Sequence, residues 1–197
     1  MALVVRTPWS RLPEALAAPG VLTALRLSLV CSVGAVVLSA LLGTPLAWLL
    51  ARVSFPGRNV VRALTVMPMV LPPVVGGVAL LLAFGRQGMV GQWLQQGLGV
   101  SLPFTTLGAI VAEAFVAMPF FVITVEAGLR SMGRRYEDAA ATLGAGRWTT
   151  FRRVTLPLMM PSLGAGAALA WARALGEFGA TITFAGNLPG ATQTMPL

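Results

Sequence analysis

The sequence predicts an all-α integral membrane protein, a polytopic helix bundle, on three observations. Its 197 residues are 56% hydrophobic and only 10% charged, with a mean hydropathy of +0.81, whereas soluble domains carry about a quarter charged residues. Four segments stay apolar over the roughly 20 residues that a helix needs to cross a bilayer core. Most of the charges lie between these segments. We therefore expect four spanning segments in a single transmembrane domain that covers residues 1–197.

The four predicted spans are residues 27–51, 63–84, 104–125 and 162–186. The first contains Gly43 and Pro45, the second has three prolines in its first half, and the third contains Pro119. Proline and glycine are tolerated at such depths where neighbouring helices or a water-lined cavity satisfy the freed backbone groups. The small residues of the fourth span would allow close helix approach, namely Gly164, Gly166, Ala167, Ala168 and Ala170. The pattern predicts packed, irregular helices rather than four independent rods.

The loops between the spans alternate between rich and poor in arginine. Residues 52–62 contain three arginines, the next connection contains only Arg86, and the third contains six. Because cytoplasmic loops collect positive charge, the first and third connections are expected in the cytoplasm and the N-terminus outside. Arg6 and Arg11 argue mildly against an outer N-terminus. The net charge of +8 is attributed to these loops rather than to nucleic-acid binding, since no basic patch is interleaved with exposed aromatics.

The residues that most enzymes and metal sites need are missing from this sequence. It contains no histidine and no lysine, so the commonest general base and metal ligand are absent, and so is the phosphate-binding G-x-x-x-x-G-K-[ST] motif. We expect no catalytic residue, no metal site and no ATP hydrolysis in this chain. The single Cys31 is expected to be a buried small hydrophobe. The first 20 residues are a poor signal peptide, because prolines and charges interrupt their apolar region.

The third connection departs from the apolar character of the chain around it. Residues 134–143 are good helix formers, with Glu137 and Asp138 near the start, where the helix dipole favours negative charge. Gly144 and Gly146 then break the run, since glycine readily takes the left-handed conformation that ends a helix. The pattern predicts two short helices that meet at a corner.

The second short helix is expected to carry Arg147, Trp148 and Phe151 and to end before Pro157. Trp148 and Phe151 are three residues apart and therefore share one helical face. Exposed aromatics beside arginines are typical of a protein interface. An amphipathic helix lying on lipid headgroups has the same composition, so the residues alone leave both interpretations open.

This loop resembles the coupling loop of type I ABC-importer permeases, the EAA-loop family. The family pattern is E-A-A, three residues, G, nine residues, then I-x-L-P. The same spacing is formed here by Asp138, Ala139, Ala140, Gly144, Val154, Thr155, Leu156 and Pro157. Asp138 stands where the family usually has Glu, with Glu137 one place earlier, and Val154 replaces Ile. Both exchanges preserve charge or shape.

The resemblance implies that this loop docks in a groove of a separate ATP-hydrolysing subunit, which binds ATP and Mg and rocks the bundle between inward- and outward-facing states. The residues implied in this coupling are Glu137, Asp138, Ala139, Ala140, Gly144, Arg147, Trp148, Phe151, Leu156 and Pro157. It further implies a homodimer of permease subunits in the lipid of the bacterial inner membrane, an oxyanion-binding protein on the outer side, and no cofactor in this chain.

The fourth span contains an arginine and a glutamate inside an apolar segment. Arg173 and Glu177 are spaced i, i+4 and can pair on one helix face, and charges within a span are functional candidates by default. One interpretation is that Arg173 contacts a translocating anion. We favour the other, that Glu177 neutralises it and locks the helix, since a paired arginine is a poor anion ligand. Glu113 belongs to the same polar cluster or lines the pathway.

The end of the sequence, residues 174–197, resembles the molybdate and tungstate branch of these permeases. The sulfate and thiosulfate branch shares "LGEFG" and is less similar after it. The resemblance implies import of a tetrahedral oxyanion, molybdate or tungstate, with sulfate or thiosulfate as the alternative. Such permeases continue into at least one more span, so the chain is expected to be incomplete at its C-terminus. A stand-alone secondary transporter or channel would leave the loop spacing unexplained.

Overall fold

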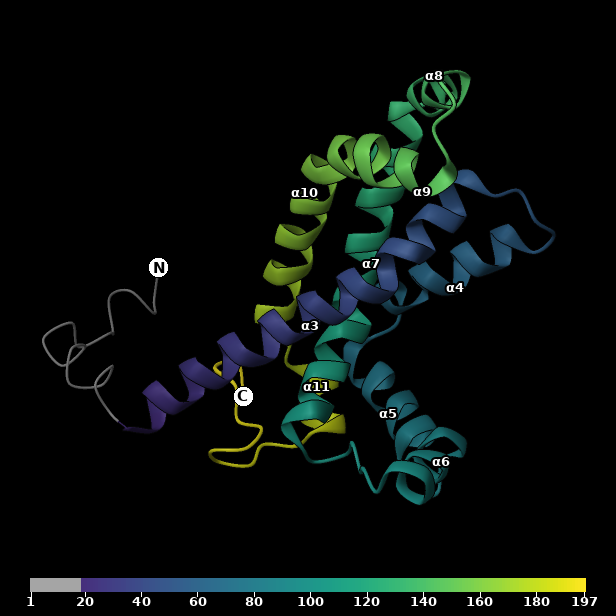
Figure 1. Cartoon of the computed structure of the whole chain (residues 1–197). Coiled ribbons are helices and arrows are strands. Elements are labelled where there is room, and N and C mark those ends of the chain that lie inside the picture. Colours follow the sequence, from purple (N-terminus) through teal and green to yellow (C-terminus); the bar gives the residue numbers. More distant parts are fainter. Residues whose placement is uncertain (1–18) are drawn as a thin grey trace, which may run out of the picture.

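The computed structural model describes residues 19–197, and every regular element within them is a helix (Figure 1). Three helices are long and apolar enough to span a membrane: α3 (Pro19–Arg52), α7 (Thr106–Met132) and the run Arg147–Leu175. The pair α5 (Pro73–Phe84) and α6 (Met89–Leu98), bent by 50°, provides a fourth if it counts as one span. This confirms the polytopic all-α class. The predictions for the N-terminus, its outer location and its unsuitability as a signal peptide, lie outside the described residues.

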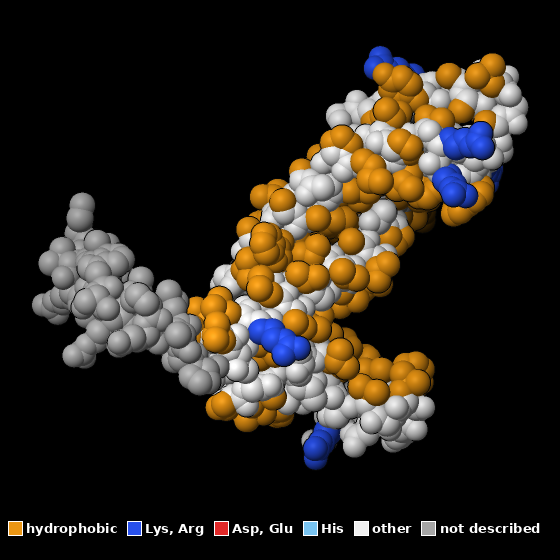
Figure 2. Space-filling view, turned by 60° about the vertical axis from the view of Figure 1, so that its left-hand side comes forward, with side chains coloured by type: hydrophobic (Ala, Val, Ile, Leu, Met, Phe, Trp, Pro, Cys, Tyr) orange, Lys and Arg blue, Asp and Glu red, His pale blue; other side chains and the backbone are white. Residues whose placement is uncertain are grey.

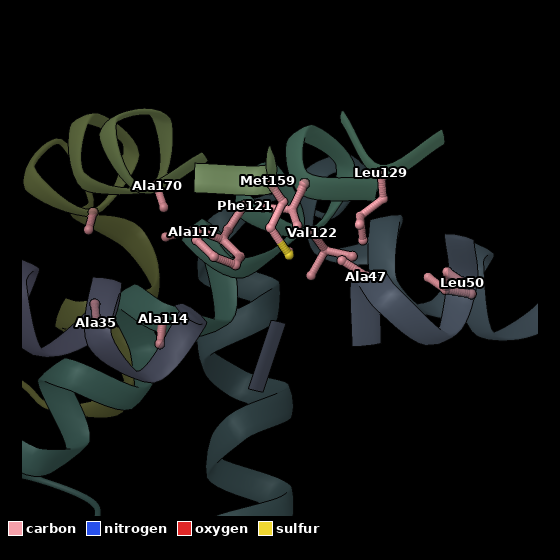
Figure 3. Close-up of a cluster of buried hydrophobic side chains, with 12 residues drawn as sticks. Ala35, Ala47, Leu50, Ala114, Ala117, Phe121, Val122, Leu129, Met159 and Ala170 are labelled. Atoms are coloured by element: carbon pink, nitrogen blue, oxygen red, sulfur yellow. The ribbon is translucent and has the colours of Figure 1, made fainter. Parts of the chain in front are cut away.

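The core of the bundle lies where α3 crosses α7 and where α10 (Leu156–Leu175) packs along α7 (Figure 1). A few large side chains, among them Phe121 and Met159, fill the space between alanines of three helices (Figure 3). Small residues set the helix spacing. A Cβ added at Gly43 would lie 2.8 Å from the Phe121 ring, and one at Gly166 would lie 3.2 Å from the Phe121 carbonyl oxygen. Ala170 is buried in the core as well, whereas Gly164 has no described atom within 4 Å, so Gly166 and Ala170 fulfil the predicted packing role and Gly164 does not.

The second predicted span, residues 63–84, is two helices rather than one. α4 (Arg58–Val70) ends at Leu71, which is extended at φ −70° and ψ 136°, and α5 begins at Pro73. A residue before proline avoids the helical region, and neither Pro72 nor Pro73 donates an N–H to the helix ladder. The proline pair therefore breaks the segment, and α4 and α5 pack on different neighbours, α7 and α11 (Gly179–Phe184).

The fourth predicted span, residues 162–186, has different bounds in the structure. Its helix ends at Leu175, and the chain turns at Gly176 before α11. The Glu177 carboxylate accepts the backbone N–H of Ala180 at 2.8 Å, and so caps the first turn of α11 in the way that N-cap side chains do. Gly179 lets α11 lie against α5, since a Cβ there would be 2.9 Å from the Pro73 side chain.

The prediction that the second short helix ends before Pro157 is wrong. α9 (Arg147–Thr150) continues through a π-helical turn, η2 (Phe151–Thr155), into α10 without a break. In this turn the N–H of Leu156 bonds to the carbonyl oxygen of Phe151, one residue further back than in an α-helix. The wider turn accommodates Pro157, which has no N–H of its own and stands in the first turn of α10.

Candidate functional site

The loop between α7 and α10 folds as the predicted corner. α8 (Arg135–Thr142) carries Glu137 and Asp138 in its first turn, and Gly144 follows it with φ +81°. The N–H of Gly144 bonds to the Ala141 carbonyl and the N–H of Ala145 to the Ala140 carbonyl, both at 3.0 Å. This pair of bonds is a glycine-terminated helix end, which satisfies two otherwise free carbonyls. α9 leaves the corner in a new direction (Figure 1).

The outer side of the corner is largely apolar and open. Leu143 is 89% exposed and Trp148 is 70% exposed. The Trp148 ring stacks on Phe151 with 5.8 Å between centroids and 25° between planes. The remaining predicted coupling residues divide by exposure: Asp138, Ala139, Gly144, Arg147 and Pro157 are exposed, while Glu137, Ala140 and Leu156 are half-buried. The structure therefore exposes part of this set and turns Glu137, Ala140 and Leu156 partly toward the rest of the chain.

A cavity of about 370 Å³ lies between this corner and the end of α3. Trp48 and Arg52 of α3 line one side, and Glu137, Asp138 and Phe151 are among the residues that line the other. Both acids of α8 therefore line this cavity, together with the basic side chains of Arg52, Arg134 and Arg147. The cavity belongs to the surface of the loop rather than to the interior of the bundle.

Four polar contacts of this loop were not foreseen from the sequence. The guanidinium of Arg52 pairs with the Glu137 carboxylate at 3.2 Å and donates to the Gly133 carbonyl at 2.7 Å. Glu137 also accepts the hydroxyl of Thr155 at 3.0 Å. Arg134 donates to the carbonyl of Arg52 itself. The partners are far apart in the sequence, so no local spacing indicates them.

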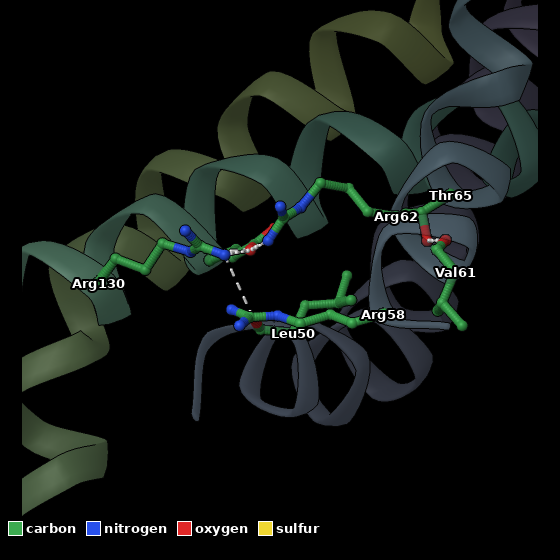
Figure 4. A network of polar contacts seen from close by, with 7 residues as sticks. Leu50, Arg58, Val61, Arg62, Thr65 and Arg130 are labelled. Atoms are coloured by element: carbon green, nitrogen blue, oxygen red, sulfur yellow. Dashed lines mark hydrogen bonds and ion pairs between the residues drawn. The ribbon is translucent and has the colours of Figure 1, made fainter. Parts of the chain in front are cut away.

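A second ionic cluster ties α4 to α7 near the same end of the bundle. The Glu126 carboxylate of α7 forms ion pairs with Arg62 of α4 and with Arg130, the latter at 2.8 Å (Figure 4). Arg58 donates to the Leu50 carbonyl at the end of α3, and Arg130 lies 3.4 Å from the same oxygen. Sequence reasoning counted these arginines only as loop charge. The spacing of Glu126 and Arg130 at i, i+4 was the available indication.

The intramembrane pair is formed as expected. Arg173 reaches one Glu177 oxygen at 2.6 Å, and the Ala180 N–H occupies the other. The Glu177 side chain is 1% exposed and that of Arg173 is 27% exposed. Glu113 of α7 is buried as well, and its Oε2 has no hydrogen-bond partner among the described residues. Among the described residues the ion pair of Arg173 is with Glu177 and not with Glu113, so the assignment of Glu113 to the same polar cluster stays a prediction. Within residues 19–197, no group of His, Cys, Asp and Glu side chains is arranged to hold a metal.

Comparison with known proteins places this sequence among transport proteins. Residues 43–197 match the family model described as "Binding-protein-dependent transport system inner membrane component". The chain is 47% identical over its whole length to the Molybdenum transport system permease protein ModB of Mycobacterium tuberculosis, of which it covers 74%. It is 45% identical to ModB of Escherichia coli over 88% of this chain and 76% of that one. The Sulfate transport system permease protein CysT of Escherichia coli is 40% identical over 96% of this chain and 68% of that protein.

Proposed function

This chain belongs to the family of binding-protein-dependent transport system inner membrane components, and we propose that it is the membrane permease of an ATP-driven importer for molybdate. The observation that carries the proposal is its similarity to molybdenum permeases at 45–47% identity over most of both chains. Sulfate transport is the second candidate, supported by 40% identity to a sulfate permease. Tungstate has the same charge and tetrahedral shape as molybdate and belongs to the first candidate.

The proposed orientation places the corner between α8 and α9 in the cytoplasm. Basic side chains gather at the end of the molecule that carries α8 and α9 (Figure 2). The arginines of this end are Arg52, Arg58, Arg62, Arg130, Arg134, Arg135, Arg147, Arg152 and Arg153, against three acids. Cytoplasmic segments near spans carry such an excess of arginine and lysine. The chain then lies in the bacterial inner membrane with the loop between α5 and α7 outside.

The partner at the corner is an ATPase subunit, which binds ATP and Mg, whereas this chain holds no cofactor. An exposed leucine, a stacked aromatic pair and an exposed aspartate, namely Leu143, Trp148, Phe151 and Asp138, form a surface typical of interface anchors. The small side chains of Ala139 and Ala140 permit close approach. The other partners are a second copy of the chain and an oxyanion-binding protein outside.

The polar cluster of Glu113, Arg173 and Glu177 is proposed as a structural lock beside the pathway. Both oxygens of Glu177 are occupied, and Arg173 is paired. An arginine in a charge-assisted pair offers little to a passing anion. Selection among oxyanions is therefore assigned to the binding protein, and the permease supplies the route.

The test is reconstitution of the full-length chain with its ATPase and binding protein in proteoliposomes. We expect uptake of labelled molybdate that requires ATP and that excess sulfate does not suppress. Gly144→Glu, which forces a charged side chain into a left-handed position at the corner, is expected to abolish uptake while the protein still inserts. ATP-dependent uptake of labelled sulfate with no uptake of molybdate would assign the sulfate function. Uptake by the chain without an ATPase would refute the importer.

A further inference from the structure

The charged loop is attached to the rest of the bundle at the last residue of α3. The Arg52 side chain is only 7% exposed and that of Glu137 is 21% exposed, so the ion pair is largely removed from water. Surface ion pairs contribute little to stability, but a buried one is costly to break, because the remaining charge is left unpaired. The Arg52–Glu137 contact is therefore a firm joint rather than an incidental surface pair.

The same carboxylate extends the joint to the start of the third long helix. Thr155, which is 2% exposed, donates its hydroxyl to Glu137 from within the π-helical turn. Arg52 in turn donates to the carbonyl of Gly133, the residue that ends α7. Arg52, Glu137 and Thr155, which we call the loop anchor, thus connect α8 with the ends of α3 and α7 and with the beginning of α10.

The two adjacent acids of α8 have different environments. Glu137 is half-buried, and its Oε1 accepts both Arg52 and Thr155 in the loop anchor, whereas Asp138 is exposed, with no ion pair to another described residue. Asp138 is therefore the acid that is more available to a cationic group of a partner. We therefore assign Asp138 to docking and Glu137 to attachment within the chain.

α8 packs against η2 and α9, so the loop moves as one unit with the start of α10. α3 packs on α7 and α10 through the apolar core, and its end is joined to the loop itself by polar contacts, namely the loop anchor and the bond from Arg134 to the Arg52 carbonyl. We propose that Arg52 and Glu137 are positioning residues that pass the movement of the α8–α9 corner to the end of α3, so that α3 follows ATP-driven closure of the partner. This rests on the proposed function, in which the corner docks on an ATPase.

The first experiment compares Arg52→Gln, Glu137→Gln and the exchange Arg52→Glu with Glu137→Arg in the complete transport complex. Arg135→Gln is the matched control, because Arg135 is an exposed loop arginine whose one bonded partner among residues 19–197 is its neighbour Tyr136. Both single variants should retain the ATPase subunit and hydrolyse ATP within about twofold of the original, while uptake per ATP falls about tenfold. Arg52→Gln and Glu137→Gln remove the same contact, so a variant with both changes should lose less uptake per ATP than the sum of the two single losses. The charge exchange should restore part of the uptake.

Unchanged uptake per ATP in both single variants would overturn the proposal. So would loss of the ATPase subunit on purification, since that outcome assigns Glu137 to docking. If either charge variant fails to insert, Thr155→Val tests the same joint without changing a charge, and a smaller fall in uptake per ATP is expected. A Thr155→Val complex that behaves as the original does would then contradict the proposal.

The second experiment does not depend on which oxyanion is carried. Spin labels at Leu41→Cys of α3 and Leu82→Cys of α5, both exposed positions, report the distance between these helices before and after addition of a non-hydrolysable ATP analogue. We expect a shift in the original complex and a loss of at least half of it in Glu137→Gln. An equal shift in both would refute transmission through the loop anchor. Failure of molybdate uptake with a normal label shift would refute only the proposed substrate.

Discussion

Replacing glutamate by glutamine is expected to affect stability differently at two buried positions, Glu177 and Glu113. Glu177 and Glu113 are 1% and 2% exposed, and glutamine has nearly the shape of glutamate. In Glu177→Gln, the 2.6 Å ion pair with Arg173 loses its negative charge, and the bond from the Ala180 N–H becomes a neutral one. In Glu113→Gln, a carboxyl whose Oε2 has no described partner becomes a neutral amide.

The magnitude for Glu177→Gln follows from these contacts. Two hydrogen bonds to a charged group contribute about 1.5–3 kcal/mol each, and a neutral acceptor retains about half of this. The unpaired Arg173 adds a desolvation cost, although its 27% exposure limits that cost. A total of about 3 kcal/mol corresponds to a fall of about 6–12 °C in melting temperature for a chain of this size. For Glu113→Gln we expect no loss, because no bonded partner is removed.

The assay is thermal unfolding of the purified complex in detergent, followed by a fluorescent dye or by light scattering, with the two variants side by side. Equal destabilisation of both variants would refute the reasoning, because it would mean that Glu113 is paired as well as Glu177. A raised molybdate uptake in Glu177→Gln would contradict the structural lock and favour Arg173 as an anion ligand that Glu177 restrains.

Three further predictions concern packing, docking and orientation. Gly77→Ala should lower the melting temperature by the equivalent of about 1–3 kcal/mol of overpacking, because its Cβ would lie 2.6 Å from the Thr183 side chain. Gly164→Ala is the control and should be neutral or stabilising, because the space around Gly164 is open. A similar effect of both substitutions would contradict the close contact of α5 with α11. Trp148→Ala should weaken retention of the ATPase subunit at least tenfold on purification without lowering the melting temperature, and full retention would remove Trp148 from the interface. A reporter that is active only outside the cytoplasm should work at Gln92, and a silent reporter there would reverse the proposed orientation.

The parts of the fold that could be read from the sequence are those with local causes. α3 and α7 are long apolar runs whose internal prolines, Pro45 and Pro119, are accommodated within the helix. The corner after α8 was predictable because Gly144 acts through its own backbone. The helix breaks inside the second and fourth predicted spans were not predicted, since hydropathy continues across Pro72 and across Glu177 while the helix does not.

The same distinction between local and tertiary causes holds for the contacts of the candidate site. The i, i+4 pair of Arg173 and Glu177 follows from helical spacing, and the structure contains it. The attachment of Glu137 to Arg52 depends on how α3 crosses α7, and no spacing along the chain encodes that crossing. Predicting it would have needed the tertiary packing first.

The helix from α9 through η2 to α10 is continuous, although the sequence presents it as two elements. It has 29 residues, which at 1.5 Å per residue is about 43 Å along the helix axis, and it changes direction on the way (Figure 1). Its first turn belongs to the docking corner, and its last turn carries Arg173. A displacement of the corner by the ATPase therefore reaches Arg173 and its partner Glu177 through one helix, with no loop in between to absorb it.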